Sequence, residues 1–217
     1  GQFIGLTVAE DIAFALENDC TPQAAMREAV DRVAALVGVE NHLGHAPHEL
    51  SGGMRQRVVG AIGMAGSPEL LIADEPTTAL DVTVQAGYLQ LLSDLKKERD
   101  LSLMIISHDF GVINRISDKV VVMYAGSAME YGDVKELWKE PKHPYTIGLL
   151  NSLPHIGNRR ERLVSIPGSA PIPGEITAGC PFAPRCDKAT EACRKETPKT
   201  IDGVHTFVRC LRYADKG

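Results

Sequence analysis

Apolar residues recur at helical spacing through the first third of the chain. They predict one helix that starts at Thr21-Pro22, where threonine supplies an N-cap hydroxyl and proline takes the first helical position, and that stops at Gly38. They predict a second helix from Ser51 to Gly66. The apolar positions on which both predictions rest are Met26, Val30, Val33, Val37, Val58, Ile62 and Ala65.

Short apolar runs then alternate with further helical segments. The apolar run 70–73 predicts a strand that is buried on both faces. The alternation of strands and helices indicates an α/β domain with a mostly parallel sheet. The other predicted elements are helices at about 82–99 and 109–116, strands at 101–106 and 119–124, and a hairpin whose turn at 125–127 leads into 128–131.

The character of the sequence changes near Pro141. From there to the end prolines and glycines are frequent and apolar periodicity weakens. This segment is therefore expected to need a stabilising staple, such as a bound metal, or a host surface on which to pack. The sequence therefore predicts two parts, a domain over 1–140 and a small C-terminal extension over 141–217 that is rich in cysteine and proline.

Composition narrows the class of protein without naming a function. The chain has 217 residues, 44% of them apolar, which is enough for one domain with an appendage. Its formal net charge of −5 gives no basic field for a nucleic-acid partner. No apolar run approaches the roughly 20 residues that span a bilayer. No secretory signal is expected, and a cytoplasmic location is expected.

The first candidate chemistry lies where the second predicted helix begins. Ser51, Gly52 and Gly53 place two residues without side chains at this helix start. Backbone N–H groups and the positive end of the helix dipole then face outward, which suits a bound phosphate.

A second candidate site joins the ends of two predicted strands. Asp74 suits Mg²⁺ held partly through water, and Glu75 suits a general base that polarises an attacking water. His108 follows the next strand and is expected at the same edge of the sheet, where it would contact a γ-phosphate or orient the water. The alternative is an acidic strand end that faces solvent beside a structural histidine. The convergence of three features at one edge favours nucleotide hydrolysis.

The order and spacing of these motifs resemble those of ATP-binding-cassette ATPases. Residues 50–57 resemble the signature motif, 70–75 the Walker B strand, 79–81 the D-loop, and His108 the switch histidine. The resemblance implies a partial P-loop NTPase fold in which two domains sandwich two ATP molecules head to tail.

The same resemblance implies a role for each matching residue. Mg²⁺ would lie at Asp74, and Glu75 and His108 would be catalytic. Ser51 and Gly53 would touch the γ-phosphate of an ATP held by the opposite subunit. The full set of implied nucleotide-binding residues is Ser51, Gly52, Gly53, Gln56 and Asp81, the last of which would cross the dimer interface.

The sequence departs from this family at the phosphate cradle. No Gly-x-x-x-x-Gly-Lys-Ser/Thr motif occurs, so the loop whose lysine holds the β- and γ-phosphates is absent, as is the aromatic residue that stacks on adenine. The chain is therefore expected to begin about one third of the way into a cassette domain, as a fragment or through loss of its start. Since each charge-assisted phosphate contact is worth roughly 1.5–3 kcal/mol, the chain alone is expected to bind ATP poorly and to be weak or inactive.

Two branches of the family are represented along the chain. Residues 1–40 resemble the cassettes of vitamin and metal-ion importers, whereas the sequence from Leu50 onward resembles the ATPases of oligopeptide and dipeptide importers, with 143–146 opening their C-terminal extension. The resemblance implies two permease subunits that contact residues 1–50, a second ATPase subunit in a homo- or heterodimer, and a separate peptide-binding protein. It also implies a location on the inner face of the cell membrane.

Four of the five cysteines lie in the predicted extension, at Cys180, Cys186, Cys193 and Cys210. In a reducing cytosol this clustering favours metal ligation over disulfides. The segment 180–186 resembles the tail of peptide-importer ATPases, some of which carry a 4Fe–4S cluster, whose negative charge Arg185 would help to offset. The alternatives are zinc, although the tight Cys-x-x-Cys knuckles of zinc ribbons are absent, and four buried thiols that pack a small lobe.

Three other functions compete with that of a peptide-importer ATPase. In the first alternative, the chain is a non-catalytic cassette that pairs with a complete subunit and supplies Ser51 and Gly53 in trans. In the second, it is a soluble cassette protein of DNA repair or translation, although neither the long insertions nor the second cassette of that group is seen. In the third, an iron–sulfur lobe is the functional part and serves electron transfer or sensing.

Overall fold

The chain folds into two compact units, Gly1–Ile116 and Ser117–Gly217. The computed structural model describes residues 3–78, 80–153, 165–172, 174–175, 178–203 and 206–216. Each unit has its own sheet and its own apolar core. No helix within these described ranges is long and apolar enough to span a membrane.

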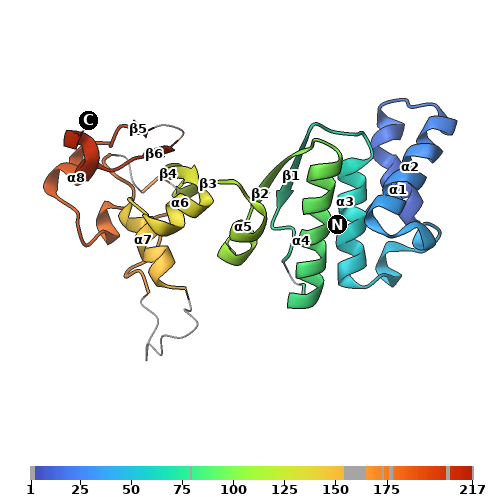
Figure 1. The fold of residues 1–217 in the computed structure, drawn as a ribbon, viewed down its shortest axis with the longest axis horizontal. Helices are drawn as coiled ribbons and strands as arrows, with labels where there is room; N and C mark the ends of the chain where they lie inside the picture. The colour runs from blue at the N-terminus through green and yellow to red at the C-terminus, as the bar shows by residue number, and fades with distance from the viewer. Residues whose placement is uncertain are drawn as a thin grey trace. The chain divides into compact units, whose positions relative to one another are not determined.

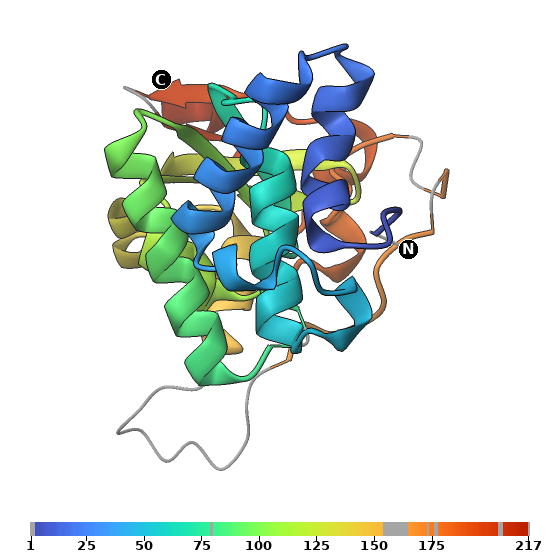
Figure 2. The ribbon, with the colours of Figure 1, turned by 90° about the vertical axis from the view of Figure 1, so that its right-hand side faces the viewer.

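Three helices form the first part of unit 1: α1 (Val8–Asn18), α2 (Gln23–Val37) and α3 (Gly52–Met64). They pack around fully buried side chains such as Ile12 and Val33, and α3 lies beside α4 (Val82–Glu98) (Figure 2). Two 3₁₀ turns, Glu40–His42 and Pro47–Glu49, connect α2 to α3.

The predicted starts and stops of α2 and α3 agree with the structure to within one or two residues, whereas α1 was not predicted. Helix α2 ends at Gly38, whose φ of 71° is readily adopted by glycine, and Ser51 is the N-cap of α3. Pro22 is itself the N-cap of α2, so the predicted cap by Thr21 is wrong and the helix starts one residue later. Helix α3 ends at Met64, two residues before Gly66.

A parallel pair of strands completes unit 1: β1 (Leu70–Asp74) and β2 (Ser102–Ile106) (Figure 1). The helices α4 (Val82–Glu98) and α5 (Phe110–Ile116) pack on one face of this sheet, against Leu71, Leu103 and Ile105. The α/β fold class predicted from the sequence is confirmed, with a small parallel sheet in unit 1.

The prediction that β1 is buried on both faces is wrong for this unit. Alternate residues of a strand point to opposite faces, and the helices of unit 1 cover one face only. Leu70 and Ile72 on the other face are 50% and 58% exposed, and Met104 and Ile106 of β2 are similarly exposed.

Unit 2 is built on an antiparallel sheet in the order β3-β4-β6-β5. Its strands are β3 (Lys119–Tyr124), β4 (Ser127–Asp133), β5 (Ile201–Gly203) and β6 (Thr206–Val208). The predicted strand at 119–124 and its hairpin are present, but they belong to this sheet and not to the parallel one. The reason is local, because Ala125 and Gly126 both have positive φ, as a two-residue hairpin turn requires, and such a turn pairs its strands antiparallel.

Short helices and turns pack on this sheet: α6 (Val134–Lys139), α7 (Pro144–Asn151), α8 (Glu191–Lys195) and the 3₁₀ turns Ala183–Arg185 and Leu211–Lys216. The core contains Met129 and three rings in mutual contact, Tyr124, Tyr145 and Phe182, with centroids 4.6–5.3 Å apart. The hairpin is thus the host surface for the cysteine-containing segment. The predicted domain boundary at residue 140 stays a prediction.

Candidate nucleotide site and cysteine pocket

The first residues of α3 differ in how much space surrounds them. The Ser51 hydroxyl accepts the backbone N–H of Met54 at 3.4 Å and so caps the helix. A Cβ added at Gly52 would meet nothing within 4 Å, whereas one at Gly53 would collide with Cγ1 of Val84 in α4. Gly52 therefore leaves room for a ligand, and Gly53 is needed for the contact between α3 and α4.

Alanine substitutions should separate these two glycines. Gly53→Ala is expected to lower the free energy of unfolding by about 1–3 kcal/mol, because Val84 is stiff and cannot give way without strain. Gly52→Ala should leave it unchanged or raise it by up to about 1 kcal/mol, since alanine favours a helix. Urea unfolding of the two variants measures the difference, and equal losses would contradict the packing role of Gly53.

The start of α3 lines a groove together with the segment that precedes α4. Its lining includes Gly52, Arg55 and Gln56 from α3, and Thr78 and Leu80 from the segment before α4. Ala79, in the predicted D-loop, lies outside the described residues. The groove brings the predicted signature and D-loop segments together within one unit.

Asp81 has a local structural role. Its Oδ1 accepts the backbone N–H groups of Thr83 and Val84 at 3.0 and 2.9 Å, which makes it the N-cap of α4. Its second carboxylate oxygen is not used by this cap, so the implied contact across a dimer interface stays a prediction.

The carboxyl ends of β1 and β2 carry the predicted acidic and histidine residues. Asp74 is exposed and pairs with Ile106 in the parallel register. The next residue, Glu75, continues the ladder by donating its N–H to the Ile106 carbonyl at 2.9 Å, and then turns the chain with a φ of 46°. This strained conformation is rare for a residue other than glycine. Because of it, the Glu75 side chain does not follow the alternation of side chains between the two faces of β1.

Glu75 and His108 are in direct contact at this edge. Oε1 of Glu75 lies 2.7 Å from Nδ1 of His108 and also accepts the backbone N–H of His108 at 3.2 Å. Its other oxygen accepts the Thr78 hydroxyl at 3.0 Å. The carboxylate is therefore oriented by two neighbours, and the histidine ring, 81% exposed, is open to a ligand.

The contact between Glu75 and His108 shifts the pKa of both side chains. The hydrogen bond from His108 lowers the pKa of the Glu75 carboxyl, and the same bond raises the pKa of His108 above its ordinary 6.5. The stabilisation by this ion pair is present between the two pKa values. It is lost as the pH rises through the raised pKa of His108 and as the pH falls through the lowered pKa of Glu75.

Removal of the Glu75 charge should reverse the shift of His108. In Glu75→Gln the pKa of the imidazole is expected to fall toward 6.5, because its main partner no longer attracts the proton. An NMR titration of the histidine ring signals measures it. Asp109→Asn is the control, since Asp109 makes the smaller contribution, and its effect should be smaller. An unchanged midpoint in Glu75→Gln would contradict the ion pair.

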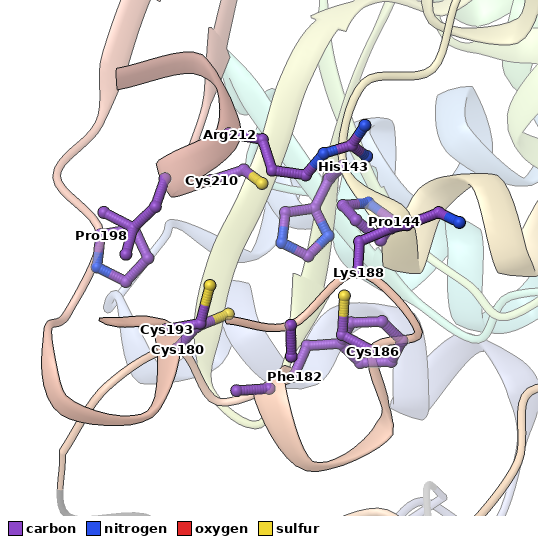
Figure 3. A pocket seen from close by; sticks show the side chains of 13 residues that line it. His143, Pro144, Cys180, Phe182, Cys186, Lys188, Cys193, Pro198, Cys210 and Arg212 are labelled. Carbon is purple, nitrogen blue, oxygen red and sulfur yellow. The ribbon is translucent and has the colours of Figure 1, made fainter. Parts of the chain in front are cut away.

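All four cysteines of unit 2 line a single pocket (Figure 3). They are free thiols, and the backbone N–H of Cys180 donates to the carbonyl of Cys193 at 2.8 Å, which ties two of their segments together. Within the described parts of the chain, no three His, Cys, Asp or Glu side chains meet closely enough to hold a single metal ion. The thiols lie instead around the walls of the pocket.

Burial raises the pKa of Cys180, Cys186 and Cys210 above that of an ordinary thiol. The neighbouring Arg212 acts in the opposite direction on Cys210. These three groups are therefore protonated at neutral pH, and any metal they bind must displace their protons.

Arg185, the cation expected from the sequence to lie beside the thiols, does not line the pocket. Arg185 donates to the carbonyls of Ile166 and Pro167 and to the Tyr124 hydroxyl, so it clamps the chain and does not line the pocket. Lys188 and Arg212 line it instead.

Two residues that contact these sites had no assigned role in the sequence. Thr78 orients Glu75, and its place directly after Glu75-Pro76 was the available signal. His143 lines the cysteine pocket, and burial lowers the pKa of its imidazole to about 4. No pattern in the sequence connects His143 to cysteines that lie 37 or more residues away.

Comparison with known proteins agrees with these motifs. The profile of the ABC transporter family matches residues 2–78, and that of the oligopeptide/dipeptide transporter C-terminal region matches residues 129–193. The oligopeptide transport ATP-binding protein OppD of Haemophilus influenzae is 49% identical over 197 residues, which are 89% of this chain and 61% of that protein. AppD of Bacillus subtilis, also an oligopeptide transport ATP-binding protein, is 43% identical over 98% of this chain and 66% of its own length.

A solved structure extends the similarity to the fold. The cbiO1 protein of Clostridium perfringens, part of the ABC transporter complex cbiONQ, has a TM-score of 0.59 and 31% identity, covering 64% of this chain and 55% of that one. The chain therefore belongs to the ATP-binding-cassette family. Within it, unit 2 carries the C-terminal region of the oligopeptide/dipeptide transporters. The chain spans less than two thirds of the length of OppD and AppD.

Proposed function

We propose that this chain is the ATP-binding subunit of an importer of dipeptides or oligopeptides. OppD of Haemophilus influenzae and AppD of Bacillus subtilis are oligopeptide transport ATP-binding proteins, and residues 129–193 match the C-terminal region of oligopeptide/dipeptide transporters. The observation that carries the proposal is the contact between Glu75 and His108 at the ends of two parallel strands. Such an edge is where α/β sheets place their ligands.

The geometry supports hydrolysis of the terminal phosphate of ATP. Glu75 takes a proton from water as the water oxygen bonds to the γ-phosphorus and the bond to the β-phosphate oxygen breaks, which releases ADP and phosphate. His108 contacts the γ-phosphate and, with Thr78, keeps the glutamate in place. Asp74 offers the exposed carboxylate oxygen that Mg²⁺ prefers, and the ion would neutralise phosphate charge.

The proposed partners follow from the composite site of this family. A second cassette subunit holds the ATP that Ser51 and Gly53 contact, and two permease subunits take up the motion at the inner face of the membrane. A separate protein captures the peptide. Gly52 supports this arrangement, because the space beside it is open to a phosphate from another molecule.

ATP hydrolysis by the purified chain, alone and mixed with a complete cassette subunit, tests this proposal. Turnover by the mixture, together with ATP-dependent uptake of a labelled dipeptide into vesicles that hold the permease, is the expected result. Turnover by the chain alone that vanishes in Glu75→Gln would exclude a purely accessory role. Hydrolysis without peptide uptake would contradict the proposed substrate.

We further propose that Cys180, Cys186, Cys193 and Cys210 hold a 4Fe–4S cluster. The donor set fits in number and type, since each iron of such a cluster takes one thiolate. Four irons also space their thiolates more widely than one ion does, in keeping with thiols that line a pocket without converging on one point. Lys188 and Arg212 would offset the negative charge. The bound cluster would supply one-electron redox chemistry.

Anaerobic purification tests the cluster. Iron and acid-labile sulfide in equal amounts, with absorbance at about 400 nm, are expected in the wild-type chain and lost in Cys186→Ser. Cys20→Ser is the matched control, because Cys20 is exposed and lies in unit 1. A colourless protein that contains zinc would contradict the proposal.

A further inference from the structure

His143 is held in one orientation at the wall of the cysteine pocket (Figure 3). Its backbone N–H donates to Oε2 of the buried Glu130 at 2.9 Å, and its ring Nδ1 accepts the backbone N–H of Tyr145 at 3.0 Å. The ring also packs against Phe182, with centroids 5.9 Å apart, and the residue is 1% exposed. These contacts leave the imidazole little freedom to turn.

The hydrogen bond to Nδ1 also fixes where the ring proton lies. A nitrogen that accepts a backbone N–H carries no proton, so the neutral imidazole is protonated at Nε2. Among the residues that the structure describes, no acceptor meets this Nε2–H. Figure 3 shows the ring lying among the thiols, so its remaining donor is available to the pocket.

We infer that His143 donates a hydrogen bond from Nε2–H to a sulfur of the cluster held by the four cysteines, and so sets its reduction potential. This inference rests on the proposed cluster. Reduction adds negative charge to the cluster, and a hydrogen bond to sulfur stabilises the more negative form. His143 is thus a positioning residue that raises the potential without ligating iron.

A redox titration followed by EPR on the full chain tests the energetic role. His143→Ser keeps an oxygen that caps α7 but lacks the ring, whereas His143→Ala loses both. We expect both variants to shift the equilibrium between oxidised and reduced cluster roughly tenfold toward the oxidised form. For one electron, this shift is a reduction potential about 59 mV more negative. Both variants lose the packing of the buried ring on Phe182, and the alanine variant, which also loses the cap, should unfold at the lower denaturant concentration. An unchanged potential in His143→Ser would overturn the inference.

Pulsed EPR of the reduced wild-type chain, grown with ¹⁵N-histidine, tests the contact without any substitution. A weak coupling from one histidine nitrogen is expected, as for a nitrogen one hydrogen bond from sulfur. No coupling, or one as strong as that of an iron ligand, would overturn the inference even if the variants fail to assemble a cluster. Wild-type chain without iron and sulfide would instead overturn the proposed cluster, and this inference with it.

Discussion

Glu75→Gln is expected to lower the rate of ATP hydrolysis by the proposed importer assembly about 10²–10⁴-fold, the contribution of a positioned general base. Glutamine has nearly the same shape: its oxygen can still accept the His108 N–H, and its NH₂ group can donate to the Thr78 hydroxyl, so the local fold should persist. What it loses is the ability to take a proton from water. ATP binding should therefore be retained while turnover is lost, which steady-state kinetics and a nucleotide-binding assay on the same preparation separate.

The neighbours of Glu75 provide the controls for this prediction. Thr78→Val removes one hydrogen bond to the carboxylate and should cost roughly 10-fold or less, because His108 still orients it. His108→Ala should cost more than Thr78→Val, since it removes the proposed contact to the phosphate as well as the observed one to Glu75. A Glu75→Gln assembly that keeps more than about a tenth of the wild-type rate would contradict the role of general base.

The contact between Glu75 and His108 illustrates what the sequence can predict about a site. Both residues follow apolar runs with a helix between them, and this pattern alone predicts parallel strands whose carboxyl ends share an edge. The positive φ of Glu75 could not be predicted in this way, because glutamate rarely adopts it without support from tertiary contacts. The edge was predictable, whereas the conformation that directs the carboxylate toward His108 was not.

The cysteine pocket illustrates the opposite case. Spacing along the chain grouped the four thiols, but it gave no means to find His143, which reaches the pocket only because Glu130 in β4 holds the start of α7. Hydrophobic pattern failed for a related reason at β1, where an apolar run cannot reveal how many faces the helices cover. Both failures concern contacts between elements, which local periodicity does not encode.

Gly179→Ala is expected to destabilise unit 2 by roughly 2–5 kcal/mol. Gly179 has a φ of 78°, which costs alanine about 1–2 kcal/mol, and the added Cβ would lie 2.6 Å from the backbone carbonyl oxygens of Cys193 and Arg194. Backbone atoms cannot rotate away as a side chain can. The clash adjoins the hydrogen bond from Cys180 to Cys193, so relief of the clash should separate these two segments of the pocket.

Gly174→Ala isolates the cost of the positive φ, because Gly174 has a φ of 86° and a Cβ there meets nothing within 4 Å. Urea unfolding should therefore show a loss of about 1–2 kcal/mol for Gly174→Ala and a clearly larger one for Gly179→Ala. Thiol labelling under native conditions should be faster in Gly179→Ala alone, since Cys180 is buried only while these segments stay paired. Equal stability and equal labelling in the two variants would show that the close approach at Gly179 does not hold the pocket together.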